Sequence, residues 1–338
     1  MDWQETLANA RGNMGPCKVC PVCDGRACKN TIPGPGAKGR GDVAIRNYAA
    51  WQDIRINMDT LHENADVSTE AELFGRTFAL PVFAGPVGAV KLHYGDKYTD
   101  GEYYDILVQA CAEAGVAGMI GDGVDLNVMK SGTAAIAKAG GIGIPTVKPW
   151  DVETVRGRMQ LARESGAFAI AMDVDAAGLP FLQNRQPPAG SKSVEELREI
   201  VDSAKVPFIV KGIMTPRGAA KAVEAGVAGI VVSNHGGRVL DGTPATAEVL
   251  PAIVREVGGR AKILVDGGIR TGLDIFKALA LGADGVIIAR PFVNAVYGGG
   301  AEGVNALVTK LQAELADVMR MTGAATLADI DETFIWAK

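Results

Sequence analysis

The chain has 338 residues, of which 48% are hydrophobic and 22% are charged, and its formal net charge is −5. This composition is typical of a globular protein and excludes a disordered or collagen-like chain. No basic excess is present to neutralise phosphates, so nucleic-acid binding is not expected. No apolar run approaches the roughly 20 residues of a membrane span. The polar residues 1–5 lack the features of a signal peptide, and we expect a cytoplasmic protein.

From about residue 80 onward, short apolar runs alternate with stretches of helical spacing. Eight runs are rich in Val and Ile and nearly continuous, which is typical of parallel strands covered on both faces. The runs are 80–84, 116–120, 142–147, 167–172, 207–210, 229–232, 263–265 and 285–288. Helices are predicted at 102–114, 152–165, 194–204, 216–225, 246–257, 272–281 and 301–321. This alternation predicts an α/β fold, a (β/α)8 TIM barrel, with an open doubly wound sheet as the alternative.

Residues 1–79 do not share this alternation. They contain a cysteine-rich segment, a Pro- and Gly-rich loop over 31–41 and a predicted helix over 43–51. We therefore divide the chain into a Cys-rich and helical N-terminal leader, 1–79, and a barrel formed by 80–338. The leader is expected to pack on the barrel or to cap it.

Polar residues and glycines directly follow most of the predicted strands. Because barrel active sites lie at the C-terminal ends of the strands, we expect these residues to converge at one rim. After the seventh run, Asp266-Gly267-Gly268 would let backbone N–H groups approach an anion closely. Arg270 and Arg290 would add positive charge. Together they predict a phosphate site; a tight turn beside solvated arginines is the alternative.

Three side chains at strand ends are candidates for catalysis. His235 follows the sixth run, and an imidazole near its ordinary pKa can take a proton at pH 7. Arg238 could hold a carboxylate by a two-pronged ion pair. Lys211 ends the fifth run, where it could form a Schiff base, face an anionic cofactor ring or lie at the surface. His62 and His93 lie outside the alternation and are expected to be structural or exposed.

Four of the five cysteines fall within twelve residues of the leader. Dense cysteines in a cytosolic chain more often bind a metal than form disulfides. Cys17, Cys20, Cys23 and Cys28 therefore predict a zinc site or an iron–sulfur cluster, with free thiols as the alternative.

Several strings of residues carry a resemblance to a known family. They are Val210-Lys211-Gly212, Ser233-Asn234-His235-Gly236-Gly237-Arg238-Val239-Leu240-Asp241, Asp266-Gly267-Gly268-Ile269-Arg270-Thr271-Gly272 and Phe276-Lys277-Ala278-Leu279-Ala280-Leu281-Gly282-Ala283. The chain resembles the FMN-dependent α-hydroxy acid oxidase and dehydrogenase family, which includes glycolate oxidase and lactate oxidase. The resemblance is strong over 205–330, looser over 78–205 and essentially absent before 78.

The resemblance implies that FMN lies across the barrel mouth. Its phosphate would bind at the loops after the last two strands, and Lys211 would stabilise negative charge at the N1–C2 edge of the reduced ring. The cofactor-binding residues implied are Pro86, Val87, Gly88, Lys211, Ser233, Asp266, Gly267, Gly268, Arg270, Ala289 and Arg290.

The resemblance also implies how a 2-hydroxy acid would react. His235 would be the base, with flavin N5 as hydride acceptor, and Asp175 would support it. Arg238 would clamp the substrate carboxylate. The chain departs from the family where 145–150 has no tyrosine and 176–179 has no second arginine. Lys148 is the candidate to replace a lost carboxylate contact.

We therefore expect oxidation of a small, lactate-like L-2-hydroxy acid to the 2-oxo acid. The electron acceptor would be oxygen or an unknown carrier, and family members are often tetramers, so a homo-oligomer is expected. One alternative is an FMN-dependent enzyme like the type 2 isopentenyl diphosphate isomerase. The other is a non-catalytic flavin barrel that carries electrons.

Overall fold

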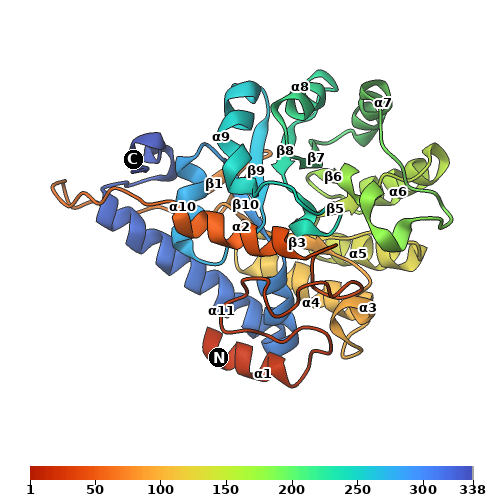
Figure 1. Cartoon of the computed structure of the whole chain (residues 1–338), viewed down its shortest axis with the longest axis horizontal. Coiled ribbons are helices and arrows are strands. Elements are labelled where there is room, and N and C mark those ends of the chain that lie inside the picture. The colour runs from red at the N-terminus through yellow and green to blue at the C-terminus, as the bar shows by residue number, and fades with distance from the viewer. Residues whose placement is uncertain (337–338) are drawn as a thin grey trace.

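Eight parallel strands close into a barrel in the computed structural model, which describes residues 1–336 (Figure 1). The strands are β3 (Val82–Val87), β4 (Ala117–Ile120), β5 (Gly143–Val147), β6 (Ile170–Asp173), β7 (Phe208–Ile213), β8 (Gly229–Val232), β9 (Lys262–Asp266) and β10 (Gly285–Ile288). Each strand pairs with the next along the chain, and β10 pairs with β3 to close the ring. The prediction of a (β/α)8 barrel is confirmed, and the open doubly wound sheet is excluded.

The continuous hydrophobicity of the runs has a direct cause in the barrel. Every residue of β4, β6, β8 and β10 is buried. Their side chains alternate between the barrel interior and the surrounding helices, so both faces need apolar residues. Strand β3 extends from Val82 to Val87, later than the predicted run, and this places Pro86 and Val87 within the strand.

The helices that surround the barrel are α3 (Val90–Tyr94), α4 (Asp100–Glu113), α5 (Leu126–Lys138), α6 (Val152–Glu164), α7 (Val194–Ala204), α8 (Pro216–Glu224), α9 (Thr246–Val257), α10 (Gly272–Ala280) and α11 (Arg290–Thr322). Helix α5 was not predicted from the sequence, and its centre contains Ser131, Gly132 and Thr133. These residues have low helix propensity. Packing stabilises the helix instead, because Gly132 lies against Ile120 of β4.

The last helix is longer than predicted and supports the N-terminal helix. Helix α11 begins at Arg290 rather than at 301, and it kinks at Gly300, where φ is +55° and ψ is −134°. Helix α1 (Trp3–Arg11), which the sequence analysis did not identify, packs along α11 (Figure 1). The backbone of Thr6 lies so close to Gly298 that a side chain there would collide with it.

The rest of the leader covers both ends of the barrel. The antiparallel hairpin of β1 (Ala71–Leu73) and β2 (Arg76–Phe78) closes the N-terminal end. There the Phe78 ring packs edge-on against Phe83, with centroids 5.1 Å apart. Helix α2 (Asp42–Asp53) contacts the loops at the opposite end. Within residues 1–336, no helix has the length and apolar character that a membrane crossing requires.

Candidate active site

A cavity of about 410 Å³ opens at the C-terminal ends of the strands. This volume falls in the usual range of small-molecule sites, about 300–1,000 Å³. Most of the predicted site residues line it, namely Pro86, Val87, Gly88, Lys148, Lys211, His235, Arg238, Asp266, Gly267, Gly268, Arg270, Ala289 and Arg290. Asp175 and Ser233 do not line the cavity themselves. Asp175 is hydrogen-bonded to His235, and Ser233 is hydrogen-bonded to Asp266.

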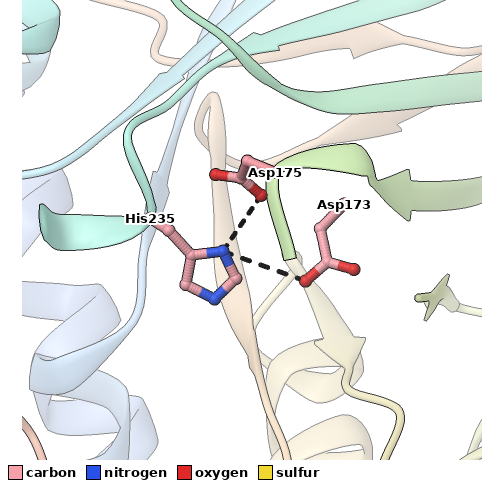
Figure 2. Close-up of side chains that lie close together, drawn as sticks. All are labelled: Asp173, Asp175 and His235. Atoms are coloured by element: carbon pink, nitrogen blue, oxygen red, sulfur yellow. Dashed lines mark hydrogen bonds and ion pairs between the residues drawn. The ribbon is translucent and has the colours of Figure 1, made fainter. Parts of the chain in front are cut away.

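His235 is oriented by two carboxylates, Asp173 at the end of β6 and Asp175 just after it. Its Nδ1 atom lies 3.0 Å from Oδ1 of Asp175 and 4.0 Å from Oδ2 of Asp173 (Figure 2). Ionised carboxylates only accept hydrogen bonds, so Nδ1 carries the imidazole proton. Figure 2 shows that Nε2 points away from both carboxylates. The free lone pair on Nε2 can therefore accept a proton.

The loop after β8 holds His235 in an uncommon backbone conformation. Its φ is +55°, in the left-handed region that few residues with side chains adopt. The Ser233 hydroxyl accepts a hydrogen bond from the His235 amide at 3.1 Å and donates to Asp266 at 2.9 Å. Strained backbone of this kind persists only where the surroundings fix it, and it is common at functional sites.

The surroundings keep the His235 ring neutral. Burial lowers the pKa of His235 well below its ordinary value, Lys211 lowers it further, and Asp173 partly opposes these effects. Burial also raises the pKa of Asp175, although the ammonium groups of Lys211 and Lys148 act in the other direction. A neutral imidazole at pH 7 is in the form that a general base needs.

Lys211 lies within β7, which extends two residues beyond it, and is buried with its Nζ 3.7 Å from Oδ2 of Asp266. Burial alone would lower the pKa of Lys211, but Asp175, Asp266 and Asp173 outweigh it and raise that pKa. The side chain is therefore an ammonium at pH 7, whereas a Schiff base requires the free amine. Gly212, with φ +104°, lets the strand pass Asp175, because a Cβ here would lie 2.5 Å from the Asp175 side chain.

Arg238 and His93 both bind the backbone of one residue of the leader, Gly34. Arg238 Nη1 donates to the carbonyl oxygen of Gly34 at 2.6 Å, and the amide of Gly34 donates to Nδ1 of His93 at 3.0 Å. The Arg238 guanidinium also lies over the Phe181 ring, 5.9 Å from its centroid. His93 and Phe181 both line the cavity, and the sequence analysis did not identify them as site residues.

Lys148 follows β5 and forms a buried ion pair. Its Nζ lies 3.3 Å from Oδ2 of Asp173, and Lys148 lines the cavity. Asp122 fixes this loop, because its Oδ2 accepts from the Lys148 amide at 3.2 Å and from the Trp150 indole at 2.6 Å. The ammonium of Lys148 is therefore held beside the His235–Asp173 contact.

Two arginines form the positive end of the cavity. Arg270 donates to the carbonyl oxygens of Cys23 at 2.8 Å and Ile269 at 2.6 Å, and Arg290 is the first residue of α11. Ala289, the residue before α11, makes no side-chain capping bond, so the N–H groups of Arg290 and Phe292 are available to an anion, whereas Pro291 has none.

The cysteines of the leader lie behind these arginines. Arg290 Nη1 is 3.8 Å from Cys28 Sγ, and Cys17 Sγ is 3.7 Å from Asn294 Oδ1. Four thiolates around one zinc lie about 4 Å apart. In residues 1–336, the only group of three or more candidate ligand atoms within 4.8 Å of one another is Asp173, Asp175 and His235. The prediction of a zinc site or an iron–sulfur cluster at Cys17, Cys20, Cys23 and Cys28 is therefore not supported.

The fold and site define a (β/α)8-barrel protein in which a carboxylate-bound imidazole, buried ammonium groups and two arginines meet around one cavity. The family model "FMN-dependent dehydrogenase" matches residues 35–189 and 183–337. The L-lactate oxidase of Lacticaseibacillus rhamnosus is 32% identical over 86% of this chain and 85% of its own length. The peroxisomal (S)-2-hydroxyacid oxidase GLO3 of Arabidopsis thaliana is 47% identical, over 43% of this chain and only 39% of its own length.

A solved structure gives the same result. A mandelate oxidase variant with (S)-mandelic acid is 27% identical, with a TM-score of 0.81, over 100% of this chain and 98% of that one. The chain belongs to the FMN-dependent dehydrogenase family and is an oxidoreductase.

The cavity fits the cofactor of this family. FMN combines a phosphate with a flat ring that becomes negatively charged on reduction. The donor set matches both parts, with Arg270, Arg290 and the start of α11 at one end and the Lys211 ammonium at the other. Residues of β3 supply a wall without charged side chains. The residues that line the cavity can thus hold FMN.

Proposed function

We propose that this enzyme oxidises a small, lactate-like L-2-hydroxy acid to the 2-oxo acid, with His235 as the base. The observation that carries the proposal is the His235–Asp175 hydrogen bond, which leaves Nε2 free at the cavity. The proposal is also supported by the relatives, which include an L-lactate oxidase and an (S)-2-hydroxyacid oxidase.

The residues around the cavity divide the work of this reaction. Arg238 binds the substrate carboxylate, since its guanidinium is held by the Gly34 carbonyl and the residue lines the cavity. His235 Nε2 takes the hydroxyl proton, and the Asp175 and Asp173 carboxylates stabilise the imidazolium that forms. FMN, when bound, supplies the acceptor for the two electrons that leave with the substrate's α-hydrogen.

Lys148 takes part on the substrate side of the cavity in this proposal. Its ammonium supplies positive charge where the chain has neither the family's tyrosine in 145–150 nor its second arginine in 176–179. Lys211 balances the charge of the cofactor ring. The cofactor ring lies along Pro86, Val87 and Gly88. Lys211 and His235 are held in place by Ser233 and Asp266. The phosphate of the cofactor is bound by Gly267, Gly268, Arg270, Ala289 and Arg290.

The electron acceptor, the assembly and the compartment form a second part of the proposal. The relatives include both an L-lactate oxidase and L-lactate dehydrogenases, so oxygen and a carrier are both candidate acceptors. We expect a cytoplasmic homo-oligomer. Turnover with and without oxygen and the mass of the assembly in solution test these points.

Anaerobic mixing of the FMN-loaded enzyme with L-lactate, glycolate and L-mandelate tests the reaction. We expect one or more of these acids to remove the absorption of the oxidised flavin, and a stoichiometric amount of 2-oxo acid to form. An oxidised flavin after mixing with every acid would contradict the proposal. That result would favour the isomerase-like or non-catalytic alternatives.

A further inference from the structure

His93 occupies a position in the cavity that the proposed reaction leaves without a role. It lies on α3, directly after β3, and only 4% of its surface is exposed. Its ring stacks at a tilt against Phe181, with centroids 5.2 Å apart, and both residues line the cavity. From its place in the sequence His93 is expected to be structural or exposed; the structure shows that it is buried and lines the cavity beside Arg238.

The hydrogen bonds of His93 fix its tautomer. Nδ1 accepts from the amide of Gly34 at 3.0 Å, and a backbone amide can only donate. Arg238 Nη2, also a donor, lies 3.5 Å from the same nitrogen. Nδ1 therefore has no proton, and Nε2 of the neutral ring is an N–H donor.

The Nε2 donor of His93 is open to a ligand. Among residues 1–336 no protein group is hydrogen-bonded to this atom, and it is not among the fully buried polar atoms that lack a partner. The open space next to His93 is the cavity, because His93 is one of its lining residues. Nε2 therefore presents its N–H to whatever binds beside Arg238.

His93 stays neutral over the working range of an enzyme. Burial lowers its pKa to about 3, and the nearby charges of Arg238, Lys148 and a protonated His235 add to this effect. A neutral ring with its proton on Nε2 cannot act as a base there, but it can donate one directed hydrogen bond.

We propose that the Nε2–H of His93 donates a hydrogen bond to the substrate carboxylate and, together with Arg238, selects 2-hydroxy acids as substrates. This inference rests on the proposed function. One residue, Gly34, then orients both carboxylate-binding groups, through its carbonyl to Arg238 and its N–H to His93.

Two conservative variants separate substrate binding from a purely structural role. The side-chain amide of His93→Asn can keep the acceptor for Gly34 but does not reach the position of Nε2. The longer amide of His93→Gln can place an N–H near that position but loses the acceptor for Gly34. The measurements are anaerobic flavin reduction by L-lactate and the change in the flavin spectrum with pyruvate. His62→Asn, at an exposed histidine outside the cavity, is the matched control.

We expect His93→Asn to weaken lactate and pyruvate binding at least about tenfold, the effect of removing a hydrogen bond to a charged group. The affinity of His93→Gln for lactate and pyruvate should stay within about threefold of the wild-type affinity. Both variants should keep the FMN content of the His62→Asn control. Normal binding by His93→Asn, or equal losses in both variants, would overturn the inference.

The same experiment separates this inference from the proposed function. A wild-type flavin that is reduced by hydroxy acids, combined with normal binding by His93→Asn, refutes only the role of His93. A wild-type flavin that neither hydroxy acids reduce nor pyruvate perturbs refutes the proposed function, and the role of His93 falls with it.

Discussion

Asn47 and Asn234 exchange two side-chain hydrogen bonds across 187 positions of the chain. The Asn47 amide nitrogen donates to Oδ1 of Asn234 at 2.8 Å, and the Asn234 amide nitrogen donates to Oδ1 of Asn47 at 2.9 Å. Both side chains are buried. This pair joins helix α2 to the loop that presents His235, so the leader is part of the active-site structure.

Replacing Asn47 by alanine should therefore destabilise the protein and reduce turnover. The change removes both hydrogen bonds to the buried Asn234 side chain and the acceptor for the Thr246 amide. An unsatisfied buried group of this kind costs about 1–3 kcal/mol of unfolding free energy. Denaturant unfolding measures it, and Arg46→Ala, on the same helix but exposed, is the control that should change little. If Asn47→Ala and Arg46→Ala unfold at the same denaturant concentration, the Asn47–Asn234 pair contributes nothing to the free energy of unfolding.

The sequence predicted the barrel and its functional rim well because both are local patterns. A buried parallel strand appears as a continuous apolar run, and the residues after each run lie at the same end of the barrel. This is why Lys211, His235 and Arg270 were correctly predicted to converge at one rim, and the structure places them around one cavity.

The contacts that the sequence did not predict join distant segments. Gly34 contacts His93 across 59 positions and Arg238 across 204, and no local pattern encodes such pairs. Helix α5 was not predicted because packing, rather than the helix propensity of its residues, stabilises it. The spacing of the cysteines suggested a zinc site or an iron–sulfur cluster, but spacing alone does not bring the sulfur atoms together around one ion.

Substitution His235→Ala should keep FMN bound and abolish flavin reduction by hydroxy acids. The lost imidazole is the proposed base, and such groups contribute about 10²–10⁴-fold to the rate. The phosphate end of the cavity is untouched by the change. Stopped-flow mixing under anaerobic conditions measures the rate, and the flavin content of the purified variant is its control. Reduction at the wild-type rate would remove His235 from the role of base.

The pH profile of kcat/KM should be flat near neutral pH. The reaction needs neutral His235, and activity is lost as the pH falls through its pKa and the ring becomes protonated. Burial and the neighbouring Lys211 place this pKa well below the ordinary value of about 6.5. The acid limb should therefore lie clearly below pH 6.5. Initial rates with L-lactate across the acidic and neutral range test this, and an acid limb centred at the ordinary histidine pKa would contradict it.

Lys211→Met should weaken FMN binding. The ammonium of Lys211 faces Asp266 at 3.7 Å and is also close to the charges of Asp175 and Asp173. Without it, the cofactor ring meets carboxylates with no compensating charge, and we expect the Kd of FMN to rise at least about tenfold. Titration of the apoprotein with FMN, followed by flavin fluorescence, measures the Kd. Lys211→Arg, which keeps the charge, should lose less affinity for FMN. Equal losses of FMN affinity in both variants would argue against an electrostatic role.

Lys148→Met should raise the pKa of His235 and weaken substrate binding. The Lys148 ammonium is paired with Asp173 at 3.3 Å, and it lowers the pKa of His235 while Asp173 raises it. Removing Lys148 leaves the Asp173 carboxylate unbalanced, so the acid limb of kcat/KM should move to higher pH. The KM for L-lactate should rise without loss of FMN if the ammonium also meets the substrate carboxylate. Lys148→Arg keeps the charge and should leave the limb in place. An unmoved limb together with an unchanged KM would mean that the Lys148–Asp173 pair only holds β5 and β6 together.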